Sequence, residues 1–370
     1  MKKKICCIFN LAATYRAAIY QLMDKELDCD FYLGDRVASP IKKMDYTSLK
    51  GYRKTLKRIH LFSHFYWQKG AVACIFKPYS QYILTGEPSY VSNWVIQLFA
   101  KLLGKEVYLW SHGFNGSQGR RYEQASKLSF KLATKGFLYG NFARNYMIKA
   151  GVKANKLICI YNSLDYNIQK PLRTNYPSAI YQTHFHSDAP VLIFLGRIQK
   201  VKKLDLLIKA IHLLKKKGKI INLVLVGKTT DVEDLEQLVE TLELNKQVWF
   251  YGPSFDETKN SELFCNADLC VSPGNIGLTA MHALSYGCPI ITNHNFCTQM
   301  PEFEAITEEK TGLFFEENNL KDLTLKIEQW LDYAKDKRET IRKDCYKVID
   351  EHYNPSYQLN VLKKTLAKSH

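Results

Sequence analysis

The chain has 370 residues, of which 46% are hydrophobic and 24% are charged. This length exceeds what one ordinary hydrophobic core organises, so two domains are expected. The sequence contains no run of 18 apolar residues, which argues against a transmembrane helix. Its start reads as a basic lead into a buried strand rather than as a signal peptide. The ten cysteines are scattered without CxxC or zinc-site spacing, which favours a reducing cytoplasm.

The formal net charge of +16 is concentrated in the first half of the chain. Residues 1–170 hold 27 Lys and Arg against 10 Asp and Glu, whereas the remainder holds 25 against 26. Three kinds of partner would explain such an excess: nucleic acid, an anionic membrane surface, or an anionic substrate.

Short β-rich apolar runs alternate with helical stretches along the whole chain, a pattern typical of parallel α/β units. Ligands of such sheets bind at the carboxyl ends of the strands, so residues that directly follow a strand deserve most weight. The expected strands are Lys4–Phe9, Cys29–Leu33, Tyr82–Leu84, Val107–Trp110, Lys135–Leu138, Leu157–Tyr161, Val191–Leu195, Asn222–Val226, Val248–Tyr251, Leu269–Ser272, Pro289–Thr292 and Gly312–Phe314.

Residues 166–189 are polar, contain two prolines and lack clear periodicity, so we expect them to connect two domains. The clearest helices between strands are Lys203–Lys217 and Asp231–Leu242. The predicted architecture is two similar-sized parallel α/β domains with a cleft between them.

The segment LGRIQKVKKLD, residues 195–205, places two cations just beyond a strand end. Gly196 allows a tight exit from the strand, and Arg197 and Lys202 follow. An arginine fork together with a mobile lysine charge suits a diphosphate. The alternative is a solvated basic turn.

The segment SPGNIGLTAMHALSYG, residues 272–287, is expected to form a strand end, a turn and a helix over Gly277–Ser285. The amides of Gly277, Leu278 and Thr279 would then be available to an anion at the helix N-terminus. His282, one turn further on, could hydrogen-bond a ribose or a phosphate. The alternative is an ordinary helix with a buried histidine.

Two further segments follow predicted strands. In HNFCTQMPEFEAI, Glu302 and Glu304 could hold sugar hydroxyls, or they could simply favour a helix N-terminus. In YLWSHGFNGS, His112 stands at a strand's carboxyl end, although a lone histidine is more often structural than catalytic.

Residues 41–70 interleave basic and aromatic side chains, among them Lys54, Lys57, Arg58 and Trp67. Such a mixture suits anionic lipid headgroups and, less strongly, RNA. The alternative is a solvated helix that flanks a core strand.

Taken together, the motifs resemble the GT-B glycosyltransferases, specifically the retaining family 4 (glycosyl transferases group 1) type, in its polysaccharide-cluster subgroup with an N-x-G-L-T-A-x-H helix. The resemblance is good over residues 190–330 and weaker in the first half, where it rests on His112-Gly113 and Asn162. The matching positions are Gly196, Arg197, Lys202, Leu225-Val226-Gly227, Val248, Phe250, Gly252, Ala267, Asp268, Pro273, Gly277, Leu278, Ala283, Gly287, Pro289–Thr292, Pro301, Glu302, Gly312 and Leu313.

The chain departs from that family at its E-x7-E pair, which falls on Gly274 and His282. In the family the first glutamate lies near the donor sugar and the second holds the ribose. The resemblance therefore implies a variant site in which His282 bonds ribose or phosphate, and Asn275, Glu302 or Glu304 contacts the sugar.

The resemblance implies two Rossmann-like domains: residues 1–168 for the acceptor and residues 185–350 for the donor. A C-terminal helix at about 350–370 would pack back on the first domain. The resemblance assigns catalysis to His112, Arg197, Lys202 and Glu302. Its expected donor-binding residues are Gly196, Gly227, Phe250, Asn275, Gly277, Leu278, Thr279, His282 and Glu304.

The implied reaction moves a sugar from a nucleotide-diphosphate sugar, UDP- or GDP-linked, to a hydroxyl of a glycan or lipid-pyrophosphate-linked acceptor. It would need neither metal nor other cofactor, and would serve polysaccharide or lipopolysaccharide synthesis at the inner face of the cytoplasmic membrane. Lys54, Lys57, Arg58 and Trp67 would face membrane or acceptor. A non-catalytic sugar-nucleotide-binding or scaffold protein is the alternative; a nucleic-acid-binding protein is suggested only by charge.

Overall fold

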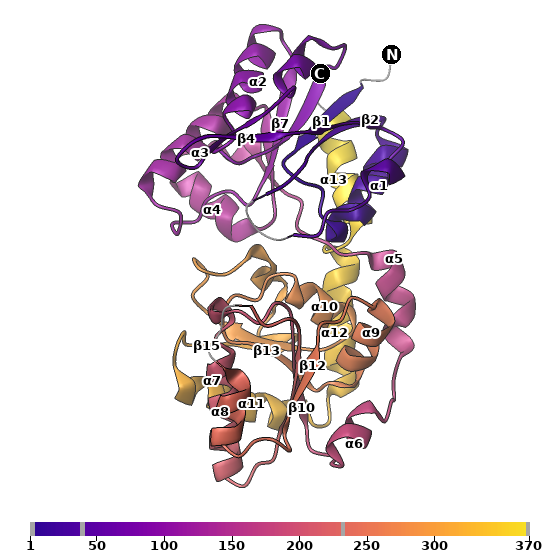
Figure 1. Ribbon diagram of the computed structural model, residues 1–370, viewed down its shortest axis with the longest axis vertical. Helices are drawn as coiled ribbons and strands as arrows, with labels where there is room; N and C mark the ends of the chain where they lie inside the picture. The colour runs from indigo at the N-terminus through magenta and orange to yellow at the C-terminus, as the bar shows by residue number, and fades with distance from the viewer. Residues whose placement is uncertain (1–3, 38–40, 231–233, 368–370) are drawn as a thin grey trace. The chain divides into compact units, whose positions relative to one another are not determined.

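The computed structural model describes residues 4–37, 41–230 and 234–367, which form two compact units (Figure 1). The first unit comprises residues 1–165 together with the C-terminal residues 354–370, and the second comprises residues 166–353. Both units are α/β and are built on parallel sheets, as the alternation of apolar runs and helical stretches predicts.

The sheet of the first unit has the strand order β3-β2-β1-β6-β7-β8-β9. From β1 the chain passes to β2 on one side and later returns to β6 on the other side, so the strand order reverses between β1 and β6. The strands are β1 (Ile5–Phe9), β2 (Cys29–Gly34), β3 (Tyr52–Leu56), β6 (Gln81–Thr85), β7 (Glu106–Ser111), β8 (Lys135–Leu138) and β9 (Leu157–Cys159), and an antiparallel hairpin is formed by β4 (Arg58–Phe62) and β5 (Phe65–Gln68).

Helices cover both faces of this sheet, which is why its central strands are apolar on both sides. Helices α1 (Ala17–Glu26) and α13 (Pro355–Ala367) pack on one face, with α13 supplying Leu359, Leu362 and Leu366. Figure 1 shows α2 (Val91–Leu102), α3 (Arg120–Leu132) and α4 (Asn141–Lys149) on the opposite face.

The sheet of the second unit has the order β12-β11-β10-β13-β14-β15, which reverses between β10 and β13. Its strands are almost wholly buried, consistent with their runs of Val, Ile and Leu. They are β10 (Val191–Leu195), β11 (Asn222–Val226), β12 (Val248–Gly252), β13 (Leu269–Ser272), β14 (Ile290–Asn293) and β15 (Gly312–Phe315).

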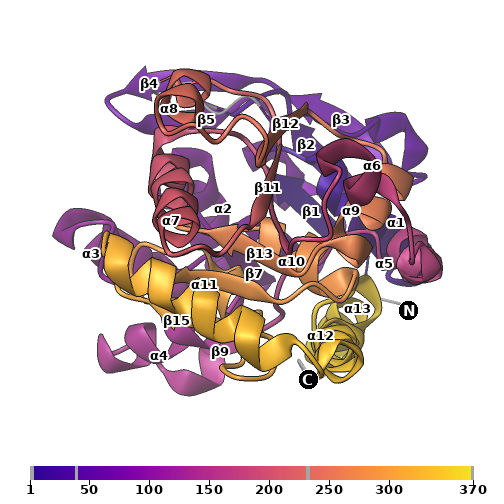
Figure 2. The same ribbon diagram turned by 90° about the horizontal axis from the view of Figure 1, so that it is seen from below.

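Two groups of helices enclose the second sheet (Figure 2). Helices α7 (Leu204–Lys216), α8 (Leu235–Thr241) and α11 (Leu320–Ala334) form one group, in which α7 packs on the other two. The second group contains α5 (Tyr166–Gln169), α6 (Ile180–Phe185), α9 (Glu257–Asn266), α10 (Thr279–Ser285) and α12 (Arg338–Glu351).

Each strand predicted from an apolar run is present, with bounds shifted by at most two residues. Residues 166–189, which show no clear periodicity in the sequence, contain α5 and α6. Two expectations were wrong in detail. The helix expected over 231–242 is shorter: Asp234 caps α8 by accepting from the amides of Glu236 and Gln237, while positions 231–233 lie outside the described residues.

The second correction concerns residues 41–70, where a solvated helix was the alternative expectation. The segment instead contains the strands β3, β4 and β5. These strands were missed because they lie at a sheet edge or in an exposed hairpin, where polar side chains interrupt the apolar pattern.

Candidate functional site

The candidate site of the second unit lies at the carboxyl ends of β10, β13 and β14. The loops that leave these strands carry Arg197 and Lys202, then Asn275, then Glu302. Since β10 and β13 are the neighbours at which the strand order reverses, their loops diverge and leave room for a ligand.

The side chain of Lys202 is held in place by two hydrogen bonds. Its ammonium donates to the backbone carbonyl of Asn275 at 2.6 Å and to the side-chain Oδ1 of the same residue at 2.7 Å. Loss of hydration, followed by the positive charge of Arg197, lowers the pKa of Lys202 to about 8, although the charge of Glu302 opposes the shift. Lys202, Arg197 and Glu302 therefore act on one another across one small region.

Arg197 differs from Lys202 because its side chain is exposed. Among the described residues, no hydrogen bond or ion pair engages its guanidinium. Glu302, by contrast, is 1% exposed. An exposed arginine beside a partly desolvated lysine offers two positive groups to an anion with several oxygens, such as a diphosphate.

Gly274 occupies the position at which the resemblance implied a glutamate, and its surroundings leave no room for a side chain. A Cβ atom at this position would lie 1.8 Å from the carbonyl oxygen of Val201 and 2.7 Å from the Cα of Lys202. The amide of Gly274 donates to the carbonyl of Lys202 at 3.0 Å. The loop after β10 thus occupies the space that a side chain at 274 would need.

The carbonyl of Gly274 is held from the other side by three buried side chains. Thr292 Oγ1, Asn293 Nδ2 and Gln299 Nε2 donate to it at 3.1, 3.0 and 3.2 Å. Gln299 also accepts from the amide of Ile276 at 2.9 Å. The sequence analysis missed this network, since amides and hydroxyls inside a strand and a loop carry no recognisable motif.

His282 lies in a second network, formed with α5 and α9. Its Nδ1 is 3.4 Å from Gln169 Nε2 and 3.6 Å from Glu257 Oε1. Glu257 also accepts from Tyr286 Oη at 2.5 Å. Desolvation lowers the pKa of His282, and the charge of Glu257 opposes that shift. Sequence reasoning missed Gln169 and Glu257, which come from segments without a site motif.

The helix expected to begin at Gly277 begins at Thr279 instead, with Leu278 in the cap position. Gly277 adopts a φ of +56°, a turn conformation that glycine enters without steric cost. The hydroxyl of Thr279 donates to the carbonyl of Leu195 at 2.7 Å, so it ties the helix to β10.

The remaining residues predicted to bind the sugar donor lie in three different parts of the second unit. A Cβ at Gly227 would lie 1.8 Å from the carbonyl oxygen of Gly196, so these glycines let the ends of β10 and β11 pass closely. Phe250 is half-buried in the edge strand β12. Glu304 is half-buried in the short 3-10 segment Pro301–Ala305 that also holds Glu302.

In the first unit, His112 follows β7 and borders a cavity of about 210 Å³. Desolvation by the surrounding protein, followed by the charge of Arg16, lowers the pKa of His112 to about 4. The ring nevertheless remains partly exposed. Asn10 and Glu87 border the same cavity. Asn10 directly follows a predicted strand and Glu87 comes three residues after one, so position after a strand was the signal available in the sequence.

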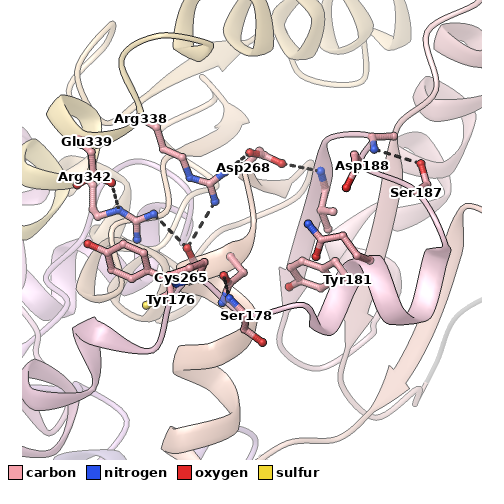
Figure 3. Close-up of a pocket in the computed structure, with 15 residues that line it drawn as sticks. Tyr176, Ser178, Tyr181, Ser187, Asp188, Cys265, Asp268, Arg338, Glu339 and Arg342 are labelled. Atoms are coloured by element: carbon pink, nitrogen blue, oxygen red, sulfur yellow. Dashed lines mark hydrogen bonds and ion pairs between the residues drawn. The ribbon is translucent and has the colours of Figure 1, made fainter.

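A larger cavity of about 360 Å³ lies in the second unit, at the amino ends of β10 and β13 (Figure 3). Arg338 donates to Asp268 at 2.6 Å, and Asp268 accepts from the amide of Val191 at 2.8 Å. Arg342 donates to the carbonyl of Cys265 at 3.1 Å. These bonds join α12 to the amino ends of the strands, whereas Lys202 lies at the carboxyl ends. They therefore stabilise the fold and are not part of the candidate site.

Of the predicted membrane-facing residues, Lys54 lies on β3, Lys57 follows it, and Arg58 and Trp67 lie on the β4–β5 hairpin. Arg58 stacks over the ring of Tyr66 at 4.5 Å. The same hairpin exposes apolar side chains, namely Ile59, Leu61, Phe62 and Phe65.

The described residues contain no group of three or more His, Cys, Asp or Glu side chains placed to hold a metal ion. Within those same residues, no helix has the length and apolar character needed to cross a bilayer.

Comparison with known families concerns mainly the second unit. Residues 179–348 match the model of the family Glycosyl transferases group 1. Among curated proteins, the chain is similar to poly(glycerol-phosphate) alpha-glucosyltransferase of Bacillus subtilis (strain 168), with 25% identity over 201 residues. The match covers 52% of this chain and 27% of that protein, so the chain spans about a quarter of the relative's length.

Solved structures share the fold of the whole chain. Anabaena Alr3699/HepE in complex with UDP has a TM-score of 0.73 at 15% identity and covers 98% of this chain and 99% of its own. The apo lipopolysaccharide outer core galactosyltransferase WaaB has a TM-score of 0.71 at 15% identity, with 99% of both chains covered. The fold is therefore GT-B, as the sequence resemblance predicted.

A glutamate at position 274, which the resemblance implied, is expected to destabilise this protein. Gly274→Glu would force the loop of Val201 and Lys202 away, at a cost of roughly 1–3 kcal/mol or more in stability. Thermal unfolding would show a lower Tm for Gly274→Glu and also for Gly274→Ala.

Gly218→Ala is the control, because a Cβ there meets nothing within 4 Å and only the positive φ of 79° is strained. A Gly274→Ala protein as stable as the Gly218→Ala protein would contradict the close packing at position 274.

Proposed function

We propose, from the match of residues 179–348 to the family Glycosyl transferases group 1, that the chain transfers a sugar from a nucleotide-diphosphate sugar to an acceptor hydroxyl. The observation that carries the proposal is that Lys202 donates to Asn275, and that the charge of Arg197 acts on Lys202, where the strand order of the second sheet reverses. Two positive groups close to each other would stabilise a departing nucleoside diphosphate.

In this proposal the protein lowers the barrier by stabilising charge that develops on the leaving diphosphate. Arg197 would bind phosphate oxygens through its fork, while Lys202 would supply a charge held in place by Asn275. The donor would be UDP- or GDP-linked, no metal would be needed, and the configuration of the sugar would be retained. Glu302, Glu304 and His282 would contact the sugar and ribose, and His112 would contact the sugar or diphosphate.

The proposed acceptor is a glycan or a lipid-pyrophosphate-linked intermediate of bacterial surface polysaccharide or lipopolysaccharide synthesis. Support comes from the names of the relatives, which act on a glycerol-phosphate polymer and on a lipopolysaccharide outer core. The hairpin β4–β5 would hold the protein at the cytoplasmic face of the membrane, since it combines exposed apolar side chains with Lys57 and Arg58.

A non-catalytic sugar-nucleotide-binding or scaffold protein is the second candidate, because Gly274 leaves no room for the family's first glutamate. The two candidates differ in turnover and agree in nucleotide binding. Release of sugar or nucleotide from a donor over time separates them.

A thermal-shift screen against UDP, GDP, ADP, CMP and dTDP is expected to show one clear responder. A nucleotide at a hundredfold excess over its Kd stabilises the protein by about 2.7 kcal/mol. Arg197→Ala should weaken that response by roughly ten- to a hundredfold in affinity, because a charge-assisted bond is lost. EDTA should leave it unchanged, and Lys25→Gln on the exposed surface of α1 is the control.

No response to any of these nucleotides would contradict nucleotide-sugar use. A response that disappears with EDTA would contradict metal independence while leaving the nucleotide site in place.

Affinity for the responding nucleotide is expected to fall as pH rises above about 8. Below the pKa of about 8, Lys202 is charged before the nucleotide binds; above it, binding must be accompanied by uptake of a proton. Isothermal titration between pH 6.5 and 9.5 should show this loss in the wild type. Lys202→Arg, which stays charged, should flatten the profile, and an equal slope in both proteins would contradict the role of Lys202.

Binding to vesicles that contain anionic phospholipid is expected to weaken several-fold when Phe62 and Phe65 are both replaced by Ser. These side chains are 63% and 39% exposed, so their removal costs little stability but deletes apolar area for the bilayer. Phe255→Ser is the matched control, because Phe255 is 89% exposed on the second unit. Equal vesicle binding by all three proteins, measured by co-sedimentation, would overturn the membrane face.

A further inference from the structure

The cavity of the first unit occupies the position at which its own sheet reverses direction. Asn10 follows β1, Glu87 follows β6, and these two strands are the neighbours between which the strand order changes. Such a position is where open parallel sheets bind ligands. At about 210 Å³ the cavity is smaller than the usual site for a drug-sized molecule, so it suits a single sugar or polyol unit.

Arg16 lines this cavity, and its positive charge is surrounded by aromatic rings. Its guanidinium lies 4.8 Å from the ring centre of Tyr139 and 6.0 Å from that of Trp110, with Tyr15 at 5.7 Å. In the part of the chain that the structure describes, no carboxylate comes within 4.0 Å of it. Aromatic faces compensate only part of the hydration that an arginine loses, so an oxyanion is its fitting partner.

His112 adds a polar group beside Arg16 without adding charge. Its ring centre lies 4.6 Å from that of Tyr139, the same ring that Arg16 covers. The pKa of His112, lowered to about 4 by loss of hydration and by Arg16, keeps the imidazole neutral at physiological pH. A neutral imidazole can donate one hydrogen bond to a ligand next to the guanidinium.

Glu87 provides the opposite charge within the same cavity. Asn10 Nδ2 donates to Glu87 Oε1 at 3.5 Å. Desolvation raises the pKa of Glu87, and the positive charges of Arg16 and Arg58 counteract that shift. The charge of Arg16 therefore acts on the carboxylate of Glu87, although the two side chains form no ion pair. A ligand with an anionic group and a hydroxyl would use both side chains at once.

We propose that this cavity binds a phosphorylated polyol or sugar unit of the acceptor, with its phosphate on Arg16 and a hydroxyl on Glu87 and Asn10. The assignment rests on the proposed transfer to an acceptor hydroxyl, and it narrows the acceptor to molecules that carry phosphate close to that hydroxyl. Tyr139 and Trp110 supply apolar ring faces against which the carbon skeleton can lie.

The test is isothermal titration of the intact protein with glycerol 1-phosphate, inorganic phosphate and glycerol, each with and without the responding nucleotide at saturation. The wild type is expected to bind glycerol 1-phosphate more tightly than phosphate, and glycerol weakest. Arg16→Gln should weaken glycerol 1-phosphate binding roughly ten- to a hundredfold, the loss of a charge-assisted contact. Arg16→Lys should fall between the two, and Lys25→Gln should match the wild type.

Glu87→Gln tests the proposed contact between Glu87 and the hydroxyl of the ligand. It should reduce the preference for glycerol 1-phosphate over inorganic phosphate, because only the former offers a hydroxyl to Glu87. Unchanged Tm and unchanged nucleotide binding in the Arg16 and Glu87 variants establish that the fold and the second-unit site are intact.

Glycerol 1-phosphate binding that survives Arg16→Gln but disappears in Arg197→Ala, or upon saturation with nucleotide, would assign the anion to the nucleotide site and overturn the proposal. Equal affinity of the wild type for glycerol and glycerol 1-phosphate would overturn it too. Since the titrations without nucleotide need no donor, they report on this cavity even if the nucleotide screen gives no responder.

Discussion

The candidate site of the second unit depends on one steric constraint, the close passage of two loop backbones at Gly274. The loop after β10 lies so near the turn after β13 that a single Cβ atom would collide with the carbonyl of Val201. This contact brings Lys202 to Asn275, and through them it fixes the lysine charge beside Arg197. Glycine at 274 is thus the condition for this arrangement of the cations, because any side chain there would displace the loop of Val201 and Lys202.

Both candidate sites lie where the strand order of a sheet reverses. Each sheet reverses its strand order once beside its first strand, between β1 and β6 in the first unit and between β10 and β13 in the second. Helices that leave the two neighbouring strands run to opposite faces, so their connecting loops separate. Polar residues gather in these openings, Asn10 and Glu87 in one unit and Lys202 and Asn275 in the other.

The sequence predicted the strands well because both parallel sheets are buried on two faces, so their strands read as uninterrupted apolar runs. It failed for β3–β5, which lie at an edge or in an exposed hairpin. Arg197 and Lys202 were found because they directly follow a strand, and Asn10 and Glu87 carried the same signal unnoticed. The Lys202–Asn275 bond and the Glu257–His282 contact were beyond reach, since long-range pairs of this kind depend on how loops and helices pack.

Several arginines of the framework form ion pairs, whereas in the part of the chain that the structure describes the two arginines at the candidate sites do not. Arg53, Arg173 and Arg338 each form an ion pair with an aspartate, and each pair joins segments far apart in the sequence. Within the described residues, Arg16 and Arg197 have no such carboxylate, although Arg16 is largely enclosed by aromatic rings and acids are common elsewhere in the chain. Arg16 is the more enclosed of the two; keeping such a cation without an internal anion costs stability, and a bound phosphate would offset that cost. Both arginines lie near the point where a sheet reverses its strand order, so in our proposals the two units would hold an anion in the same way.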